Sequence, residues 1–259
     1  MDYAAVQALV KSTREIVLAK RELKVSMKGA SDFVTDVDLA ISSYLKEELA
    51  KLDASVGFFS EEEAGCLHDD CWILDPIDGT TNLVYDYQLS SVSLARYVSG
   101  QIVFGIVYNP FTQETFMAVR GEGAWYNGER RLQVSDRPIS QALVEFGAGS
   151  THKENTEENF GLAMEIFRHC VDVRRICSSA LDLCYIAAGR IDGYFERVLK
   201  PWDVAAGSLI LEEAGGIITD YAGAPLQFAS KTSVVAGNAP VHAYLLETVQ
   251  RFEEGRRHG

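Results

Sequence analysis

The sequence predicts a mixed α+β and α/β protein, with an antiparallel meander in its first half and an α/β lobe in its second half. Short strand-like runs within residues 91–126 are separated by Gly or Asn-Pro, which is the pattern of a meander. From residue 142 onward, strand-like and helix-like segments alternate, as they do in α/β folds. A chain of 259 residues suffices for one large domain or for two closely packed lobes.

The first half is expected to open with two amphipathic helices. Apolar side chains recur with a period near 3.6 residues, first between residues 6 and 17 and again between residues 41 and 52. Thr35 precedes the second helix as a candidate cap, and Asp36 and Asp38 place acidic groups in its first turn. The strand-like runs that follow are VGFF from Val56, CWIL from Cys71, SVSLARYV from Ser91, IVFGIVY from Ile102, ETFMAV from Glu114 and GAWY from Gly123.

The second half is expected to alternate strands with helices as far as a terminal amphipathic helix. Its strand-like segments are residues 142–145, VDVRRI from Val171, IDGYFE from Ile191, IIT from Ile217 and SVVAG from Ser233. Its helices are predicted at residues 156–168, within SSALDLCYIAA from Ser178, within VAAGSLILEEAG from Val204, and around Val241, Leu245 and Val249. The turn at residues 136–138 is the expected boundary between lobes 1–138 and 139–259, without a flexible linker.

The net charge of the chain argues against nucleic acid as a partner. Its 37 acidic and 24 basic residues give −13 at pH 7, and such a field repels a phosphate backbone. The five cysteines form no CxxC pair, and their odd number is typical of a reducing compartment. No apolar run has the features of a signal peptide or the roughly 18 residues of a membrane span. We therefore expect a cytoplasmic protein that contacts neither membrane nor nucleic acid.

Two aspartates follow the apolar run CWIL. Asp75 and Asp78 flank Pro76, which fixes its own φ and favours extended geometry at the residue before it. Asp75 is therefore expected to end the strand, with Asp78 turning back beside it. Gly79 allows a tight turn and offers a backbone N–H to an anion. An ordinary Asp-Pro and Asp-Gly turn explains the same four residues.

Three further acidic positions also have ordinary structural explanations. Glu61 lies in the run SEEE at the end of a strand, and such a run is most simply a solvated face. Asp203 begins a helix, where it can act only as an N-cap. Asp38, in the first turn after Thr35, can serve the helix cap alone.

Taken together, the carboxylates predict a metal site. Glu61, Asp75, Asp78 and Asp203 all stand at ends of strands or helices and can converge on one point. Close carboxylates without a cation would repel one another, and their pKa values would rise. Oxygen-rich clusters suit Mg²⁺, and four negative charges balance two such ions. Two ions can polarise a phosphate and activate a water for attack on it.

These motifs resemble the inositol monophosphatase family of Mg²⁺-dependent, lithium-sensitive phosphatases. DPIDGTTN at residues 75–82 is similar to the first family signature, and WDVAAGSLILEEAGG at residues 202–216 is similar to the second. SEEE and the segment DFVTDVD at residues 32–38 occur in the matching order, so the resemblance covers nearly the whole chain. It implies a layered αβαβα sandwich, a homodimer, and hydrolysis without a covalent phosphoenzyme.

The resemblance also implies a set of metal ligands. Glu61, Asp75 and the backbone carbonyl of Ile77 would bind a first Mg²⁺ ion. Asp75, Asp78 and Asp203 would bind a second ion. A third, weaker ion would lie near Glu61, which places Glu61 among the catalytic groups as well. On this basis lobe 1–138 carries most of the metal ligands, and lobe 139–259 carries Asp203 and the substrate contacts.

The resemblance implies roles for the remaining site residues. Thr80, paired with Asp38, would orient and deprotonate the attacking water. The backbone N–H groups of Gly79 and Thr80 would hold the phosphate. The side chains that face the substrate hydroxyls would be Asp78, Glu196 and Asp203.

Two positions depart from the family pattern near the expected substrate site. Cys177 stands where a typical family segment has glycine, and it either packs against its neighbours or narrows the pocket. Ala148 stands where the family often has a serine, which would remove one hydroxyl contact to the substrate.

The expected activity is Mg²⁺-dependent hydrolysis of inositol monophosphate or a similar polyol phosphate. Fructose 1,6-bisphosphate and 3′-phosphoadenosine 5′-phosphate are alternative substrates within the same chemistry. The moderate length and the absence of long insertions in the meander favour the inositol-type substrate. A regulatory or scaffold protein that keeps the fold and binds a partner is the alternative of a different class. Retention of Glu61, Asp75, Asp78, Thr80 and Asp203 together argues against that alternative.

Overall fold

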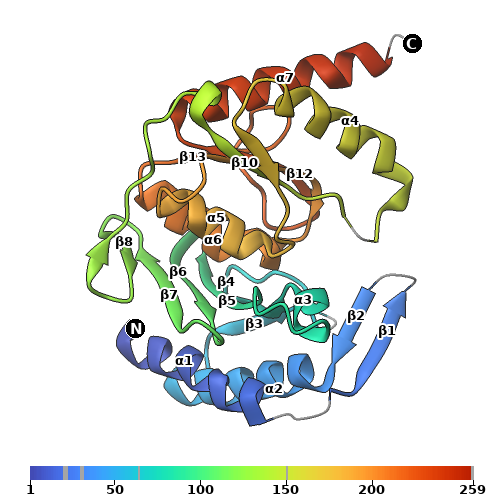
Figure 1. Cartoon of the computed structure of the whole chain (residues 1–259). Coiled ribbons are helices and arrows are strands. Elements are labelled where there is room, and N and C mark those ends of the chain that lie inside the picture. The colour runs from blue at the N-terminus through green and yellow to red at the C-terminus, as the bar shows by residue number, and fades with distance from the viewer. Residues whose placement is uncertain (20–22, 30–31, 64, 150, 258–259) are drawn as a thin grey trace.

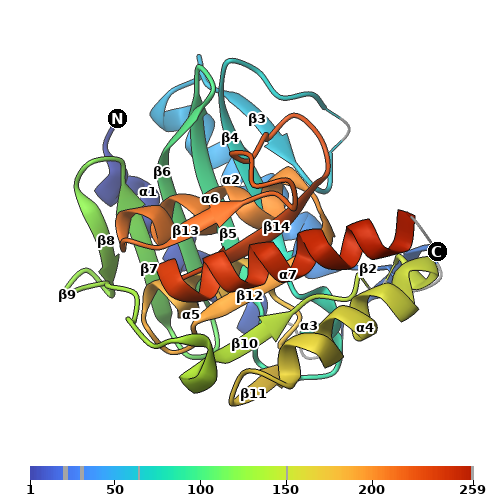
Figure 2. The ribbon, with the colours of Figure 1, turned by 90° about the horizontal axis from the view of Figure 1, so that it is seen from above.

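The computed structural model describes residues 1–19, 23–29, 32–63, 65–149 and 151–257, which form five stacked layers. Helices α1 and α2 cover one face of a seven-stranded sheet, and α5 and α6 lie between that sheet and a five-stranded sheet (Figure 1). Helices α4 and α7 cover the outer face of the second sheet, as the view from above shows (Figure 2). The expected αβαβα sandwich is thus confirmed.

Apart from the short α3, which was not predicted, the helices agree closely with those expected from the sequence. They are α1 (Tyr3–Ala19), α2 (Asp36–Leu52), α3 (Thr80–Val84), α4 (Thr156–Phe167), α5 (Ser179–Ala187), α6 (Pro201–Glu213) and α7 (Ala239–Arg257), with 3-10 turns η1 (Ile139–Gln141) and η2 (Lys153–Asn155). Thr35 caps α2 as expected: its side chain accepts a hydrogen bond from the backbone N–H of Val37 at 3.2 Å.

The seven-stranded sheet contains the predicted meander. Its strands are β3 (Gly57–Ser60), β4 (Asp70–Asp78), β5 (Ser91–Val98), β6 (Gln101–Asn109), β7 (Glu114–Val119), β8 (Gly123–Tyr126) and β9 (Arg130–Arg131), in spatial order of sequence. Strands β3 and β4 pair in parallel, and every later pair is antiparallel. A separate antiparallel pair is formed by β1 (Val25–Gly29) and β2 (Asp32–Thr35).

The prediction that the strand ends at Asp75 is wrong. Strand β4 continues to Asp78, with Asp75 opposite Ser93 and Asp78 opposite Ser91, so β4 holds one extra residue between these pairs. Pro76 has no N–H to donate to the ladder, and a bulge accommodates it without ending the strand. The bulge places both aspartates at the end of the sheet that borders the cavity described below.

The second sheet combines parallel and antiparallel pairs. It contains β10 (Leu143–Phe146), β11 (Asp172–Arg174), β12 (Gly193–Leu199), β13 (Ile217–Thr219) and β14 (Thr232–Gly237) in the order β11-β10-β12-β14-β13. The pairs β11–β10 and β10–β12 are parallel, whereas β12–β14 and β14–β13 are antiparallel. The alternation of strands with helices in this half therefore indicated its α/β character correctly.

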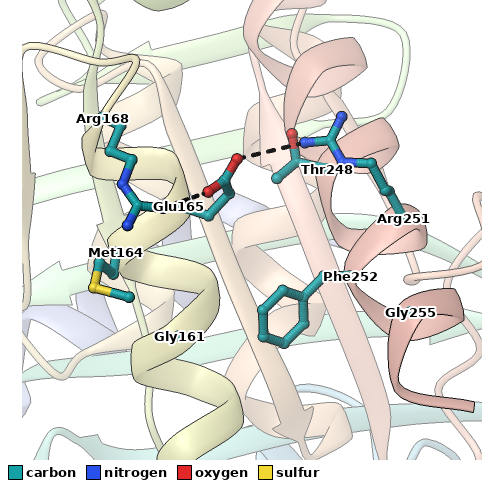
Figure 3. A pocket seen from close by; sticks show the side chains of 8 residues that line it. All are labelled: Gly161, Met164, Glu165, Arg168, Thr248, Arg251, Phe252 and Gly255. Atoms are coloured by element: carbon teal, nitrogen blue, oxygen red, sulfur yellow. Dashed lines mark hydrogen bonds and ion pairs between the residues drawn. The ribbon is translucent and has the colours of Figure 1, made fainter. Parts of the chain in front are cut away.

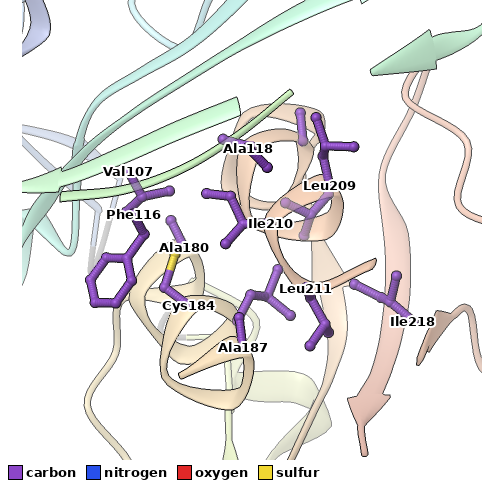
Figure 4. Packing of buried hydrophobic residues seen from close by; sticks show 14 of the residues in the cluster. Val107, Phe116, Ala118, Ala180, Cys184, Ala187, Leu209, Ile210, Leu211 and Ile218 are labelled. Carbon is purple, nitrogen blue, oxygen red and sulfur yellow. The ribbon is translucent and has the colours of Figure 1, made fainter. Parts of the chain in front are cut away.

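Helices α5 and α6 join the two sheets into one core. Figure 4 shows Ile210 of α6 and Cys184 of α5 packed toward Phe116 and Val107 of the first sheet, with Ile218 of the second sheet on the far side. Buried apolar area of this kind is the main favourable contribution to folding. Helix α6 belongs by sequence to the second half, yet it packs on the first sheet. The two halves therefore share one core, and the lobe boundary at residues 136–138 remains a prediction.

Asp192 ties the segment between the sheets to the second sheet. Its fully buried carboxylate accepts hydrogen bonds from Ser135 Oγ, from Arg137 Nε at 2.8 Å and from the backbone N–H of Leu143 at 2.8 Å.

We expect Asp192→Ala to lower the free energy of unfolding by about 3 kcal/mol, because buried donors and a guanidinium lose their acceptor. Urea unfolding measures this loss. The exposed neighbour Asp136 supplies the matched variant, Asp136→Ala, which should stay within about 0.5 kcal/mol of the parent protein. An equal loss in both variants would contradict the role of Asp192.

None of the helices within the described ranges is both long enough and apolar enough to cross a membrane.

Candidate active site

The predicted site residues border one cavity of about 600 Å³. Its lining includes the residue that follows β3, the end of β4, α3, the loop after β10, the start of α5, β12 and the start of α6. The residues of the predicted metal site that it brings together are Glu61, Asp75, Ile77, Asp78 and Asp203. Gly79, Thr80 and Glu196 also line this cavity, so segments more than 100 residues apart in the chain meet there.

Local hydrogen bonds orient the two aspartates of β4. Asp75 Oδ1 accepts from the backbone N–H of Ile77 at 3.0 Å, across the bulge at Pro76. Asp78 Oδ2 accepts from Ser178 Oγ at 2.6 Å and from the backbone N–H of Ala180 at 2.8 Å. The start of α5 therefore fixes Asp78, a contact between distant segments that local sequence patterns did not reveal.

Asp203 is not the N-cap of its helix. It is the third residue of α6, and its Oδ2 accepts from the backbone N–H of Lys200, which precedes the helix, at 2.7 Å. The carboxylate therefore satisfies an otherwise open backbone donor at the start of the helix and also lines the cavity. Asp203 can therefore stabilise the start of α6 and also serve as a ligand in the cavity.

Glu61 belongs to the cavity, whereas Glu63 of the same acidic run is directed elsewhere. Glu61 follows β3, and its backbone N–H donates to Leu74 O at 3.2 Å, which continues the pairing of β3 with β4. Glu63 forms a surface ion pair with Lys46 at 2.6 Å. The explanation of the whole SEEE run as a solvated face is therefore wrong for Glu61, which lines the cavity.

The clustered carboxylates raise one another's pKa values. Burial raises the pKa of Asp75 well above its usual range, and the negative charge of Glu61 raises it further. Burial also raises the pKa of Asp203, followed by repulsion from Asp78. Burial raises the pKa of Asp78 itself to about 7, although hydrogen bonds to its carboxylate act in the opposite direction. A bound divalent cation would remove this repulsion.

The donor set fits Mg²⁺ in its chemistry. Mg²⁺ prefers hard oxygen ligands, and a divalent cation among these carboxylates would offset their mutual repulsion. Within the described residues, no three Asp, Glu, His or Cys side chains lie close enough to enclose a metal ion as they stand. Asp75, Asp78 and Asp203 each accept a hydrogen bond from a backbone or hydroxyl donor. One oxygen of each carboxylate makes those bonds, which leaves the other oxygen for a cation.

Asp38 and Thr80 lie together at the edge of this cavity. Thr80 Oγ1 is 3.3 Å from Asp38 Oδ1 and 3.0 Å from the backbone carbonyl of Ile77. The other carboxylate oxygen of Asp38 accepts from the backbone N–H of Thr35 at 2.9 Å, which completes the cap of α2. Burial raises the pKa of Asp38 to about 6, so this carboxyl can exchange a proton near neutral pH.

Gly79 has the conformation that the turn requires. Its φ of +84° lies in the left-handed region. A Cβ placed there would be 3.0 Å from Cys177 O and 3.1 Å from Leu89 O, so a larger residue would collide with backbone.

Glu196 lies on the side of the cavity formed by the second sheet. It accepts from Tyr194 Oη and, at 3.1 Å, from the backbone N–H of Gly149. Burial raises the pKa of this carboxyl. Glu196 is therefore held in a fixed orientation in which it can accept a hydrogen bond from a hydroxyl of a ligand.

Several cavity residues were missed or only partly interpreted in the sequence. Cys177 lines the cavity with a φ of +60°, which is unusual for a residue other than glycine, so it occupies the backbone conformation that glycine would favour. Lys153, Arg175 and Lys231 also border the cavity. No spacing pattern distinguishes these basic residues from other surface residues, because they come from three separate loops.

A second cavity, between α4 and α7, offers no comparable chemistry. It measures about 430 Å³, and Met164, Phe252 and the paired Glu165 and Arg168 face it (Figure 3). The Glu165 carboxylate is bound by Arg168 at 2.7 Å, so it is already neutralised. The cavity at the end of β4 is therefore the candidate active site.

Comparison with known proteins agrees with this geometry. The family model of the inositol monophosphatase family matches residues 1–254. The chain belongs to the inositol monophosphatase family. An inositol-1-monophosphatase of Mesorhizobium japonicum is 39% identical over 254 residues, which cover 95% of this chain and 94% of that protein. The Nus factor SuhB of Escherichia coli K12 is 36% identical over 231 residues, covering 88% of this chain and 86% of that protein.

Solved structures of this inositol monophosphatase family share the fold along nearly the whole chain. The extragenic suppressor protein SuhB of Bartonella henselae has a TM-score of 0.89 at 33% identity, covering 96% of this chain and 97% of that one. An IMPase of Thermotoga maritima has a TM-score of 0.90 at 28% identity, covering 98% and 99% of the two chains. As a member of the inositol monophosphatase family, the protein is a phosphatase, and the family is Mg²⁺-dependent.

Proposed function

We propose that this protein hydrolyses inositol monophosphate or a similar polyol phosphate to the free alcohol and inorganic phosphate in the presence of Mg²⁺. The observation that carries the proposal is the meeting of Glu61, Asp75, Asp78 and Asp203 in one cavity that also contains Thr80. The 39% identical relative named inositol-1-monophosphatase supports the inositol-type substrate. Mg²⁺ held by these carboxylates and by the Ile77 carbonyl would neutralise the phosphate and lower the pKa of the attacking water.

The residues of this chain would divide the remaining work among binding, orientation and proton transfer. The backbone N–H groups of Gly79 and Thr80 would hold phosphate oxygens in the turn after β4, where the left-handed Gly79 brings the backbone close. Glu196, together with Asp78 and Asp203, would accept hydrogen bonds from the polyol hydroxyls. Burial in the cavity strengthens each of these contacts, because competing water is reduced.

Asp38 is assigned the role of proton acceptor through Thr80. The Thr80 hydroxyl lies between Asp38 and the backbone carbonyl of Ile77, which is a proposed metal ligand. A water beside this hydroxyl can pass a proton toward the carboxylate.

Asp38→Ala should reduce kcat by about 10²–10⁴-fold while the Mg²⁺ concentration for half-maximal activity stays close to that of the parent. Steady-state kinetics over a Mg²⁺ series measures both quantities.

Asp36→Ala is the matched control for the Asp38 variant. Asp36 lies in the same first turn of α2, and its Oδ1 accepts from the backbone N–H of Lys24 at 3.2 Å, away from Thr80. The control should retain kcat. Thermal unfolding of both variants separates lost chemistry from a weakened helix start. Recovery of kcat in Asp38→Ala at high Mg²⁺ would show that Asp38 serves metal binding instead.

The proposed function is tested by phosphate release from a panel of phosphomonoesters with added Mg²⁺. The panel includes inositol 1-phosphate, fructose 1,6-bisphosphate and 3′-phosphoadenosine 5′-phosphate, and kcat/KM ranks them. Release from inositol 1-phosphate that requires Mg²⁺ is the expected result. Absence of release from every sugar or polyol phosphate would refute the proposal.

A regulatory role is the second candidate, favoured by one observation. Relatives 36% identical to this chain are named Nus factor SuhB, a name that refers to no phosphate substrate. Such a role would not need the metal ligands. A cellular phenotype of deleting this protein that Asp75→Asn restores fully would support the regulatory role, whereas failure to restore it would support catalysis.

A further inference from the structure

We propose that Tyr194 and Gly147 are positioning residues that fix the Glu196 carboxylate where it meets a hydroxyl of the substrate. Tyr194 acts by donating a hydrogen bond to this carboxylate, and Gly147 acts by leaving the space in which the carboxylate lies. The inference rests on the proposed function, in which Glu196 accepts a hydrogen bond from a polyol hydroxyl. It adds the two residues on which the geometry of that contact depends.

The three residues meet because two neighbouring strands of the second sheet pair in parallel. Glu145 of β10 lies opposite Tyr194 of β12. The backbone N–H of Gly147 donates to Phe195 O at 3.0 Å, which carries the pairing past the end of β10. Because alternate side chains of a strand share a face, Tyr194 and Glu196 lie on the same face of the sheet, beside Gly147.

Tyr194 is a buried donor whose partner is Glu196. The tyrosine is 1% exposed, and its Oη donates to Glu196 Oε2. An ionised carboxylate only accepts hydrogen bonds, so the tyrosine must be the donor in this pair. Ser179 Oγ lies 3.0 Å from the same tyrosine oxygen and 3.5 Å from Glu196 Oε2. Two hydroxyl groups therefore surround one oxygen of Glu196, whereas its Oε1 accepts from the backbone N–H of Gly149 at 3.1 Å.

The protonation of the two groups agrees with these roles. Burial raises the pKa of Tyr194 well above its usual range, and the negative charge of Glu196 raises it further, so the hydroxyl keeps its proton. Burial also raises the pKa of Glu196, and the hydrogen bond from Tyr194 is the largest contribution that lowers it again. Tyr194 thus stabilises the ionised form of Glu196, which is the form that accepts a hydrogen bond from a substrate hydroxyl.

Gly147 provides the space for the carboxylate. A Cβ at this position would lie 1.8 Å from Glu196 Oε2 and 2.0 Å from its Cδ, so the carboxylate occupies the volume that a side chain would take. The φ of Gly147 is outside the left-handed region, so its backbone conformation does not require glycine. Gly147 and Glu196 both line the cavity, whereas Tyr194 is not among the described residues that border it. Tyr194 therefore acts on the cavity through Glu196.

The test measures kcat and KM for inositol 1-phosphate in the Mg²⁺-loaded, full-length protein. Tyr194→Phe keeps the ring in the core and removes the donor, and Gly147→Ala displaces the carboxylate. Each should raise KM about tenfold and leave kcat within about twofold, because the contact with Glu196 is made in both the ground state and the transition state. The inhibition constant of inorganic phosphate, which has no polyol, should stay unchanged. Thermal unfolding checks that both variants are folded.

Tyr126→Phe is the matched control. Tyr126 Oη also donates to a carboxylate, Glu114 Oε1, at 3.2 Å, but this pair belongs to the first sheet and does not line the cavity. Its loss should leave KM for inositol 1-phosphate unchanged. A double variant locates the effect of Tyr194. When Glu196→Ala is already present, Tyr194→Phe should raise KM by no more than about twofold, because the side chain through which it acts is absent.

Three outcomes would overturn the inference. The first is a KM for inositol 1-phosphate that equals the parent value in Tyr194→Phe and Gly147→Ala. The second is a tenfold rise caused by Tyr194→Phe when Glu196 has already been replaced by alanine. The third is an equal rise in the inhibition constant of inorganic phosphate, which would indicate a general distortion of the site. All three leave the proposed phosphatase activity intact, because the parent protein still releases phosphate. Absence of release by the parent from every substrate would instead refute the proposed function itself.

Discussion

Asp75→Asn is expected to reduce Mg²⁺-dependent turnover by at least about a thousandfold, because the residue proposed to contact two cations loses its charge. The carboxylate lies at the bulge of β4, and its Oδ1 accepts from the backbone N–H of Ile77 at 3.0 Å. Asparagine can keep that hydrogen bond, so the local backbone should be preserved. Phosphate release at saturating Mg²⁺ measures the effect. Parent-like Mg²⁺-dependent rates in this variant would contradict the metal assignment.

The same substitution should stabilise the protein without divalent ions. Burial and the charge of Glu61 raise the folded-state pKa of Asp75, so ionised Asp75 costs stability as pH rises from the unfolded-state pKa toward the folded one. At pH 7 in chelator, Asp75→Asn should therefore be more stable by about 1–2 kcal/mol, with the difference vanishing below about pH 4. Denaturant unfolding at the two pH values measures it. Exposed Asp69 provides the control variant, Asp69→Asn, which should change neither activity nor stability.

Gly105→Ala is expected to lower the free energy of unfolding by about 2–3 kcal/mol, through a collision between β6 and α6. A Cβ at Gly105 would lie 2.8 Å from Ala206 O and 3.0 Å from Ala206 Cα. Both are backbone atoms of a helix buried between two sheets, so a change of side-chain rotamer cannot relieve the contact. Chemical denaturation should show a lower midpoint with an unchanged slope.

Gly255→Ala is the comparison variant, for which we expect no loss in the free energy of unfolding. Gly255 lies in α7, and a Cβ there meets nothing within 4 Å. Alanine is the better helix former, so this variant should be as stable as the parent or more stable by up to about 1 kcal/mol. If Gly105→Ala unfolds at the same denaturant concentration as Gly255→Ala, the close approach of β6 and α6 does not limit stability.

Hydrophobic periodicity and turn residues were sufficient to predict most helices and strands. The helix with Val6, Val10 and Val17 on one face is present as α1, and these three side chains are buried. The strand through Trp72 was predicted, but its end was not, because a bulge at Pro76 depends on pairing with β5. Local sequence sets the period of each element, whereas the partner strand decides where pairing stops.

Glu61 shows how far the sequence can define a site. The three consecutive glutamates carry the same side chain and cannot be distinguished by type. In the structure, however, Glu61 lines the cavity and Glu63 binds Lys46 on the surface. The place of Glu61 at the end of a predicted strand, rather than charge spacing, separated it from its neighbours. The basic residues Lys153, Arg175 and Lys231 had no such pattern, and only folding brings them to the border of one cavity.

The sequence by itself determined the mixed α and β character and the acidic residues at element ends, and its family signatures implied the layered architecture and the phosphatase family. Only the tertiary structure decided that Asp78 is held by the start of α5, and that Asp203, Asp75 and several basic residues border one cavity. The reason is physical. Periodicity and helix capping act over a few residues of sequence. Repulsion among carboxylates, and its relief by a cation, depend on distances between segments that only folding brings together.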